Sequence, residues 1–232
     1  MSEFFCLSYE YSESLMARKL PSGVPIEIVR CPVNSQHWST GKQRLDALRG
    51  APLSGEVKHN KRDEMMIWVQ VSGECLVHDR VTSEMRLRGF TGLELGPATI
   101  RFRDGQVSSD YKRLDIRGWG GQAHPESGVR LVEKCPACPV KSYGKLIDAT
   151  RLIDESQWSG EDFFMVWPLY SYIFVTKRVV EYLESAKVRS YKIYRVEELA
   201  GAAGKWGFGV RSLKEYLPDD LAERYGGPLG IL

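Results

Sequence analysis

Alternation of apolar and polar positions runs through the first half of the chain and predicts short strands. The side chains of a strand point in turn to opposite faces, so such a pattern indicates strands with one covered face. The segment from Phe4 to Tyr11 nearly alternates and predicts an amphipathic strand. The other candidate strands are residues 26–29, 66–71, 75–77, 99–103 and 113–117. Ser39 or Thr40 could cap a short helix that continues to Leu48.

The second half of the chain predicts a strand, a helix and a strand in succession. Residues 172–175 and 191–196 are rich in β-branched and aromatic side chains. Between them, Thr176 is placed to cap a helix whose apolar positions follow a period of 3.6 residues. Those positions are Val179, Val180, Leu183 and Ala186. We also expect a turn within residues 162–169 and a last short helix over residues 213–217.

These elements together predict an α+β fold with mixed or antiparallel sheets and a few short helices. The composition changes after a glycine-containing loop at residues 119–128. We therefore expect a β-rich N-terminal domain over residues 1–129 and an α+β C-terminal domain over residues 130–232.

Composition excludes several classes of protein. The chain has 232 residues, of which 43% are hydrophobic and 27% charged, as in ordinary globular proteins. It contains no run of about 20 apolar residues, and residues 1–11 do not resemble a signal peptide. We therefore expect a cytoplasmic protein without a membrane partner, whose five cysteines are thiols or metal ligands.

The net charge of +2 gives no reason to expect nucleic acid as a partner. Basic stretches at residues 58–62, 86–88, 101–103 and 112–113 could face a phosphate backbone, and Phe102 and Tyr111 could stack on bases. Alternating charges of this kind more often form the solvated face of a sheet. Nucleic-acid binding therefore ranks below binding of a partner protein.

The sequence Cys135-Pro-Ala-Cys138 is the clearest chemical signal, because two thiolates at this spacing supply half of a tetrahedral zinc site. A second pair would have to come from Cys31-Pro-Val-Asn34, where asparagine stands in the second position. His37 could supply the missing ligand. The candidate zinc ligands are thus Cys31, His37, Cys135 and Cys138.

Two departures favour a vestigial site over a working one. Asn34 is a poor zinc ligand, and Pro139 stands where zinc knuckles usually carry glycine. Proline fixes φ and has no N–H to donate to a thiolate. The sequence therefore predicts no cofactor, with zinc as the open alternative and a degenerate, zinc-knuckle-like CPxC element in the fold. A redox role for the two cysteines is a third, weaker interpretation.

Three segments resemble one known family. They are VRCPVN at residues 29–34, LELGP at 93–97, and the stretch from EKCPACP at 133–139 through LIDATRL at 146–152 to residues 162–184. Their order is similar to that of the myxobacterial paralogous family named for its double CXXCG motif. That family includes immunity proteins of swarm-inhibition toxin systems. The last part of the chain also resembles a broader family of immunity proteins against polymorphic toxins, so the C-terminal domain would be immunity-like.

The resemblance implies a protein that binds a cognate toxin, usually encoded by a neighbouring gene, and covers its active site. A toxin that attacks nucleic acid would have a basic active site, so the inhibitor would offer carboxylates. The candidate contact residues are Asp154, Glu155, Trp158, Glu161 and Asp162. The alternative function is a zinc-binding nucleic-acid-binding or regulatory protein.

No catalytic motif suggests an enzyme. The sequence lacks GxSxG, GxxxxGK[ST], HExxH and GxGxxG, and its four histidines are scattered. His78 and Asp79 are adjacent, and adjacent residues of a strand point to opposite faces, so we interpret them as turn residues. We expect no catalytic residues and no small-molecule substrate.

Overall fold

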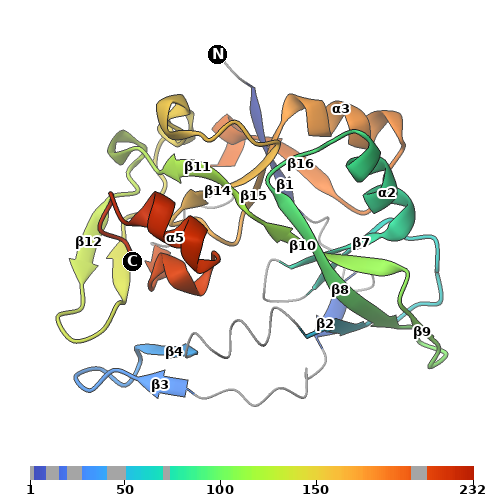
Figure 1. Cartoon of the computed structure of the whole chain (residues 1–232), viewed down its shortest axis with the longest axis horizontal. Helices are drawn as coiled ribbons and strands as arrows, with labels where there is room; N and C mark the ends of the chain where they lie inside the picture. Colours follow the sequence, from blue (N-terminus) through green and yellow to red (C-terminus); the bar gives the residue numbers. More distant parts are fainter. Residues whose placement is uncertain (1–2, 9–15, 20–27, 41–50, 70–73, 200–207) are drawn as a thin grey trace.

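The fold is described from a computed structural model, which places residues 3–8, 16–19, 28–40, 51–69, 74–199 and 208–232 (Figure 1). Two large sheets, one closed into a barrel, pack together and share a hydrophobic core. Two small sheets lie at the opposite end of the molecule from the barrel (Figure 1).

Six strands close into a mixed barrel. In chain order they are β2 (Met16–Lys19), β5 (Leu53–Glu56), β6 (Met66–Val69), β7 (Cys75–His78), β8 (Leu93–Arg101) and β10 (Tyr111–Ile116). Around the barrel the order is β10-β7-β6-β2-β5-β8, and β8 pairs with β10 to close the ring. The pairs β2–β6 and β5–β8 are parallel, and the other four are antiparallel. The short β9 (Val107–Ser108) continues from β8.

Small and large side chains alternate to fill the barrel. On β8 the residues Ala98 and Ile100 face inward, and Phe102 follows them into the same core cluster. Gly55 on the adjacent strand has no room for a side chain, because a Cβ atom there would lie 3.0 Å from Cβ of Ala17. Close packing of this kind leaves the interior filled by side chains, so the barrel forms a core and no pore.

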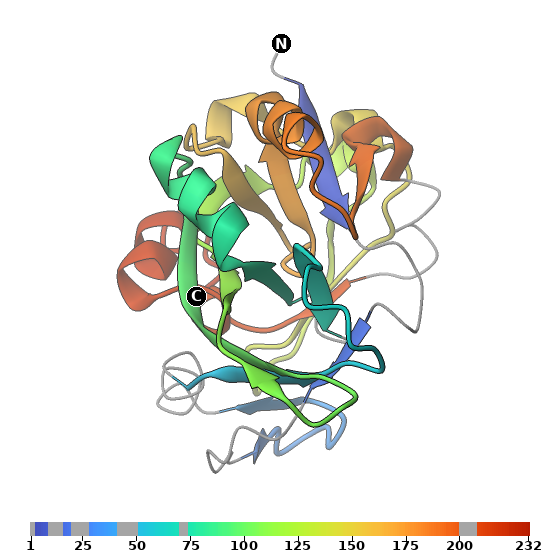
Figure 2. The same ribbon diagram turned by 90° about the vertical axis from the view of Figure 1, so that its right-hand side faces the viewer.

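The second large sheet has five strands in the order β11-β14-β15-β1-β16. They are β1 (Phe4–Ser8), β11 (Gly118–Gln122), β14 (Phe163–Trp167), β15 (Ile173–Thr176) and β16 (Lys192–Arg195). Only β11–β14 is parallel among its pairs. Helices α2 (Asp79–Leu87) and α3 (Lys177–Ser185) pack against one of its faces, beside the barrel (Figure 2).

Both faces of β1 are covered, so the prediction of an amphipathic first strand is wrong. Phe5 and Leu7 pack into the cluster shared with the barrel, α2 and α3. Phe4 and Cys6 pack on the opposite face, into a cluster that includes Trp167. A strand in the middle of a doubly covered sheet carries apolar residues at every position, and the polar residues that suggested alternation lie beyond Ser8.

The five-stranded sheet joins segments from both sides of residue 129. Strand β1 lies between β15 and β16, and β11 pairs with β14. The two predicted regions, 1–129 and 130–232, therefore both contribute strands to one sheet and its core. The domain boundary at residue 129 stays a prediction.

Smaller elements complete the fold. The strands are β3 (Ile28–Arg30), β4 (Trp38–Thr40), β12 (Leu131–Lys134), β13 (Lys141–Tyr143) and β17 (Phe208–Val210). The residues that the structure describes include the single-turn helices η1 (Pro125–Ser127), η2 (Ala149–Arg151), η3 (Glu155–Gln157), η4 (Val196–Glu198) and η5 (Leu213–Glu215), and helix α5 (Asp219–Gly226) near the end. None of the helices in the described part of the chain has the length and apolar character needed to cross a membrane.

Mixed sheets with a few short helices are present, as the α+β prediction requires. Helix α3 buries Val179, Val180 and Leu183 as predicted, but Ala186 is the exposed C-cap residue. The Thr176 hydroxyl donates to Asp162 and does not cap the helix. The prediction of a turn within residues 162–169 is wrong for residues 163–167, because these form the fully buried strand β14. Where a short helix was expected over residues 213–217, the chain forms the single turn η5, and the last helix, α5, begins after Pro218. The helix expected after Ser39 or Thr40 lies outside the described residues from 41 onward, and both of these residues belong to β4.

Candidate metal centre

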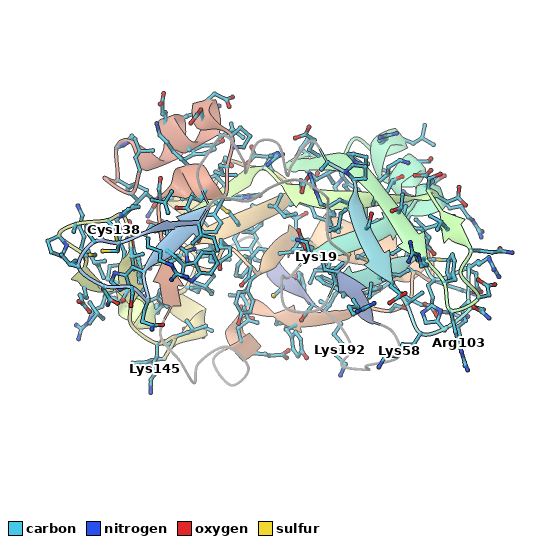
Figure 3. The ribbon with its side chains drawn as sticks, turned by 90° about the horizontal axis from the view of Figure 1, so that it is seen from below. Lys19, Lys58, Arg103, Cys138, Lys145 and Lys192 are labelled. Atoms are coloured by element: carbon cyan, nitrogen blue, oxygen red, sulfur yellow. The ribbon has the colours of Figure 1, made fainter. Side chains whose placement is uncertain are left out.

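Two hairpin tips meet at one end of the molecule. Strands β3 and β4 form a two-stranded antiparallel sheet, with Cys31 directly after β3 and His37 directly before β4. Cys135 follows β12, and Cys138 lies in the loop that leads to β13. Figure 1 shows the β3–β4 hairpin on the same side of the molecule as β12, and Figure 3 places Cys138 beside it.

The four candidate ligands from the sequence converge here. The sulfurs of Cys31 and Cys135 lie 3.8 Å apart, and Sγ of Cys138 lies 3.6 Å from Nδ1 of His37. One ligand atom from each residue fits within 4.8 Å of all the others. Cys31 and Cys135 are buried, and the other two are partly exposed. This cluster could hold a metal ion, so its geometry favours the metal-site alternative over the vestigial one.

Asn34 shapes the first hairpin tip and leaves the ligand position to His37. Its side-chain oxygen accepts from the N–H of Gln36, and its carbonyl accepts from the N–H of His37. The N–H of Cys31 donates to the carbonyl of His37 at 2.8 Å and closes the tip. Asparagine commonly forms such a turn with its own backbone. The residue that breaks the CXXC pattern therefore positions the histidine.

The second tip compensates for Pro139, which has no N–H. The N–H of Cys135 donates to the carbonyl of Val140 at 2.9 Å, which closes the loop around Cys138. The backbone N–H of Val140 also lies against the thiol of Cys138, where it acts to lower the pKa of that thiol. The N–H that the sequence lacks at position 139 is thus supplied one residue later.

The electrostatics of the cluster favour one thiolate first. Burial raises the pKa of the Cys31 thiol, but the backbone N–H groups of Val33 and Asn34 and the two neighbouring thiols bring it down to about 7. Burial and the neighbouring thiols raise the pKa of Cys138 to about 11. Thiolates close together repel, so a cation among them is needed to ionise the whole set.

The other three histidines each have a structural role at a turn or helix start. In each, Nδ1 accepts a backbone N–H from the residue two positions later: His78 from Arg80, His124 from Glu126, and His59 from Lys61. His78 thereby caps α2 as the last residue of β7, and Asp79 is the first residue of α2, so the interpretation of this pair as turn residues is wrong. His37 is the histidine whose Nδ1 faces a thiol.

The predicted toxin-contact residues lie elsewhere, and several have structural partners. Asp162 is only 7% exposed and accepts from the N–H of Thr91 and from Arg178, so it is not available to a partner. Asp154 caps η3, and Trp158 is half-buried with its indole N–H donating to the carbonyl of Glu161.

Glu155 and Glu161 remain at the surface or partly so. Glu155 is exposed in η3, and Glu161 accepts from the hydroxyl of Ser159. Phe102 and Tyr111, which the lower-ranked nucleic-acid alternative would use to stack on bases, are each only 1% exposed and pack inside the barrel.

One contact beside the cysteine cluster has no signal in the sequence. The guanidinium of Arg211 lies 4.5 Å from the ring centre of Trp38, next to the cysteine cluster. Arg211 directly follows β17, which pairs with β13. No local pattern links residues 38 and 211, so only the fold could reveal this contact. Neither a scan against models of known protein families nor a search of curated proteins finds a match to the chain.

Proposed function

We propose that this protein is a zinc-stabilised binding protein that neutralises a cognate toxin by covering its active site. The observation that supports it best is the four-ligand cluster, which ties together two hairpins with exposed apolar side chains. The following paragraphs give the support for the metal, for the binding surface and for the partner.

Zinc is the ion that suits this ligand set. Zinc–sulfur bonds of about 2.3 Å and zinc–nitrogen bonds of about 2.0–2.1 Å in a tetrahedron place two sulfurs about 3.8 Å apart and a sulfur and a nitrogen about 3.6 Å apart. The Cys31–Cys135 and Cys138–His37 distances are 3.8 and 3.6 Å. Three thiols and one imidazole are also the soft and borderline ligands that zinc prefers.

The number of ligands supports a structural role. Catalytic zinc sites keep one position open for water or substrate, whereas structural sites have four protein ligands. The cluster offers four. Zinc would neutralise the thiolates and hold the β3–β4 hairpin against the β12–β13 hairpin, with no chemistry of its own.

The two hairpins carry many exposed apolar side chains. Large apolar residues exposed on and beside them are Ile28, Val29, Val33, Trp38, Leu131 and Val132. Trp38 and Arg211 add the two residue types most enriched where binding energy concentrates. Exposed apolar patches on soluble proteins mark interaction sites. A standard interface would bury about 800 Å² on this protein.

The identity of the partner rests on the resemblance to immunity proteins, which is carried by the order of the segments. It favours a cytoplasmic protein whose toxin is encoded by a neighbouring gene. Binding would act by occlusion: a preformed surface covers the active site of the toxin and leaves no room for its substrate. The carboxylates of Glu155 and Glu161 remain candidates for a second contact.

The test is capture of the products of neighbouring genes by the purified protein, with the zinc content of the same sample measured. We expect 1:1 capture of a toxin domain and rescue of growth on co-expression. Val33→Asp with Val132→Asp should weaken capture at least 100-fold, because both side chains are exposed on the two hairpins. Val107→Asp on β9 is the matched control, because Val107 is 60% exposed, close to the 66% of Val33 and the 69% of Val132.

Two outcomes would contradict the proposal. Failure to capture any neighbouring product, together with salt-dependent retention on a nucleic-acid column, would support the regulatory alternative. Equal capture by the hairpin variant and the control would move the contact surface away from the metal centre.

A further inference from the structure

A cleft on the outer surface of the barrel lies at the far end of the molecule from the cysteine cluster. It has a volume of about 630 Å³ and is lined by residues of β2, of β5 and the turn after it, and of β8 and the turn after it. Figure 3 shows Lys58 and Arg103 at this end and Cys138 at the other. Ligand pockets in proteins commonly have volumes of about 300–1,000 Å³.

Strand alternation explains why cationic side chains gather in this cleft. On β8 and its continuation, Ile100 and Phe102 point into the barrel, so Arg101 and Arg103 point outward. Directly after the neighbouring strand β5, Val57 packs into the barrel core and Lys58 is exposed. Arg101 is the last residue of β8, and Arg103 lies two residues later in the turn after it.

The charges of the cleft do not cancel. Its lining holds four cationic side chains and one carboxylate, Glu56, which already accepts from Arg18. Lys58, Arg101 and Arg103 form no hydrogen bond or ion pair through their side chains with any residue that the structure describes. Three exposed positive charges therefore share one cleft, against a net charge of only +2 for the whole chain.

Backbone hydrogen bonds fix the relative positions of the Cα atoms of these three residues. The ladder between β5 and β8 continues past the end of β5. Along it, Val57 N–H donates to Arg101 O at 3.0 Å and Arg103 N–H donates to His59 O at 3.2 Å. Lys58 lies between these two bonds, so its Cα is fixed opposite the two arginines. Charges on a rigid scaffold bind an anion with less ordering cost than charges on a loop.

The chemistry of the lining favours phosphate. Arginine forms paired hydrogen bonds to phosphate oxygens, and lysine adds a compact positive charge. The two apolar side chains of the cleft, Val57 and Phe102, are each only 1% exposed, so they offer no surface for a protein segment or for stacking of a base. Such a site recognises the oxygens of phosphate groups and offers nothing to an apolar ligand.

We propose that the cleft formed by Arg18, Lys58, Arg101 and Arg103 binds a small ligand with linked phosphate groups. Free polyphosphate and the triphosphate of a nucleotide share this chemistry. The cleft is remote from the proposed toxin-binding surface, so this inference stands independently of the proposed function.

The experiment is calorimetric titration of the full chain with sodium tripolyphosphate at about 150 mM salt, a concentration at which weak surface attraction is screened. We expect one site per chain and at least a 10-fold loss of affinity in the double variant Arg101→Gln, Arg103→Gln. Both side chains are exposed, so the variant should keep its fold, which a thermal melt checks.

The matched control removes two positive charges elsewhere. Arg80→Gln with Arg86→Gln on α2 changes two exposed arginines that form no ion pair with a described residue. This variant should bind tripolyphosphate as the unaltered protein does. Titration with adenosine triphosphate then separates the two sources, because tighter binding than tripolyphosphate identifies a nucleotide and weaker binding identifies free polyphosphate.

Three results would overturn the proposal. The first is no saturable binding of either phosphate compound at this salt concentration. The second is an equal loss of affinity in the α2 control, which would indicate attraction by net charge alone. The third is equal binding of citrate, whose three carboxylates carry similar charge without phosphate geometry.

Discussion

The β3–β4 hairpin should depend on the metal centre for its order. Ile28 and Val29 are half-exposed and Val33 is 66% exposed, so the hairpin buries little apolar surface of its own. An isolated two-stranded hairpin is at best marginally stable in water. Loss of zinc, or of one ligand in Cys138→Ser, should therefore release the hairpin while the barrel stays folded.

The expected magnitude follows from linkage. A ligand present at 1,000 times its dissociation constant stabilises the bound form by about 4 kcal/mol, which is about a thousandfold in the opening equilibrium. The amides of Cys31 and His37 donate hydrogen bonds within the hairpin tip, so their hydrogen exchange reports its opening. We expect exchange at least 100-fold faster after chelation or in Cys138→Ser, with no change in β10.

Ala137→Ser is the control, because it places the same hydroxyl in the same exposed loop without removing a ligand. It should retain both zinc and slow exchange. Equal hairpin exchange with and without metal would refute the reasoning, since the hairpin would then be held by other contacts. Faster exchange in β10 as well would show that the metal stabilises the whole fold.

Three further predictions concern stability. Burial raises the pKa of the Glu215 carboxyl to about 7, above the value of 4.5 expected in the unfolded chain. Unfolding then releases a proton above pH 4.5. The free energy of unfolding, measured by urea denaturation, should therefore fall by up to about 3 kcal/mol as pH rises from 4.5 to 7. The same dependence of this free energy on pH in Glu215→Gln would disprove the prediction. Asp162→Ala should lower the free energy of unfolding by about 2–4 kcal/mol, because the Thr91 N–H and the Arg178 guanidinium lose their acceptor. Glu126→Ala removes an exposed ion pair with Arg151 and should cost under about 0.5 kcal/mol. Similar costs for the two variants would contradict this reasoning. Gly55→Ala should cost about 1–3 kcal/mol, because its Cβ would lie 3.1 Å from Ile100, and an unchanged melting curve would contradict the barrel packing.

Local periodicity was sufficient to predict helix α3 and its flanking strands. Val179, Val180 and Leu183 recur at the helical period, and all three are buried as expected. The predicted strands at 66–71, 75–77 and 113–117 correspond to β6, β7 and β10. In each case the pattern that identifies the element lies within its own residues, although β15 and β16 pair with the distant β1.

The closed barrel could not be predicted in the same way. Its closure depends on parallel pairs between distant segments, such as Met16 with Trp68 and Leu53 with Ala98. Strands of four residues carry too few alternations to specify a partner. The apparent turn at 162–169 failed for a related reason, because a strand covered on both faces shows no alternation at all.

The candidate site was partly visible in the sequence. The spacing of Cys135 and Cys138 indicates a ligand pair, and His37 was identified as a substitute ligand. Asn34 and Pro139 each depart from the zinc-knuckle pattern, and taken alone each favours a vestigial site. The fold changes that judgement through backbone groups, because Val140 supplies the N–H that Pro139 lacks and the backbone of Asn34 positions the histidine.

The candidate metal centre contacts the C-terminal strands, and the barrel lies at the other end of the molecule. Arg211 lies over Trp38 on the hairpin and directly follows β17, and β17 pairs with β13 beside the second pair of ligands. The hairpin therefore contacts the residue that follows the C-terminal strand β17, whereas the barrel closes through hydrogen bonds of its own. Metal removal should accordingly abolish capture of the partner while the protein stays folded and still binds tripolyphosphate. Because the two sites can fail independently, a defect in one does not count as evidence against the other.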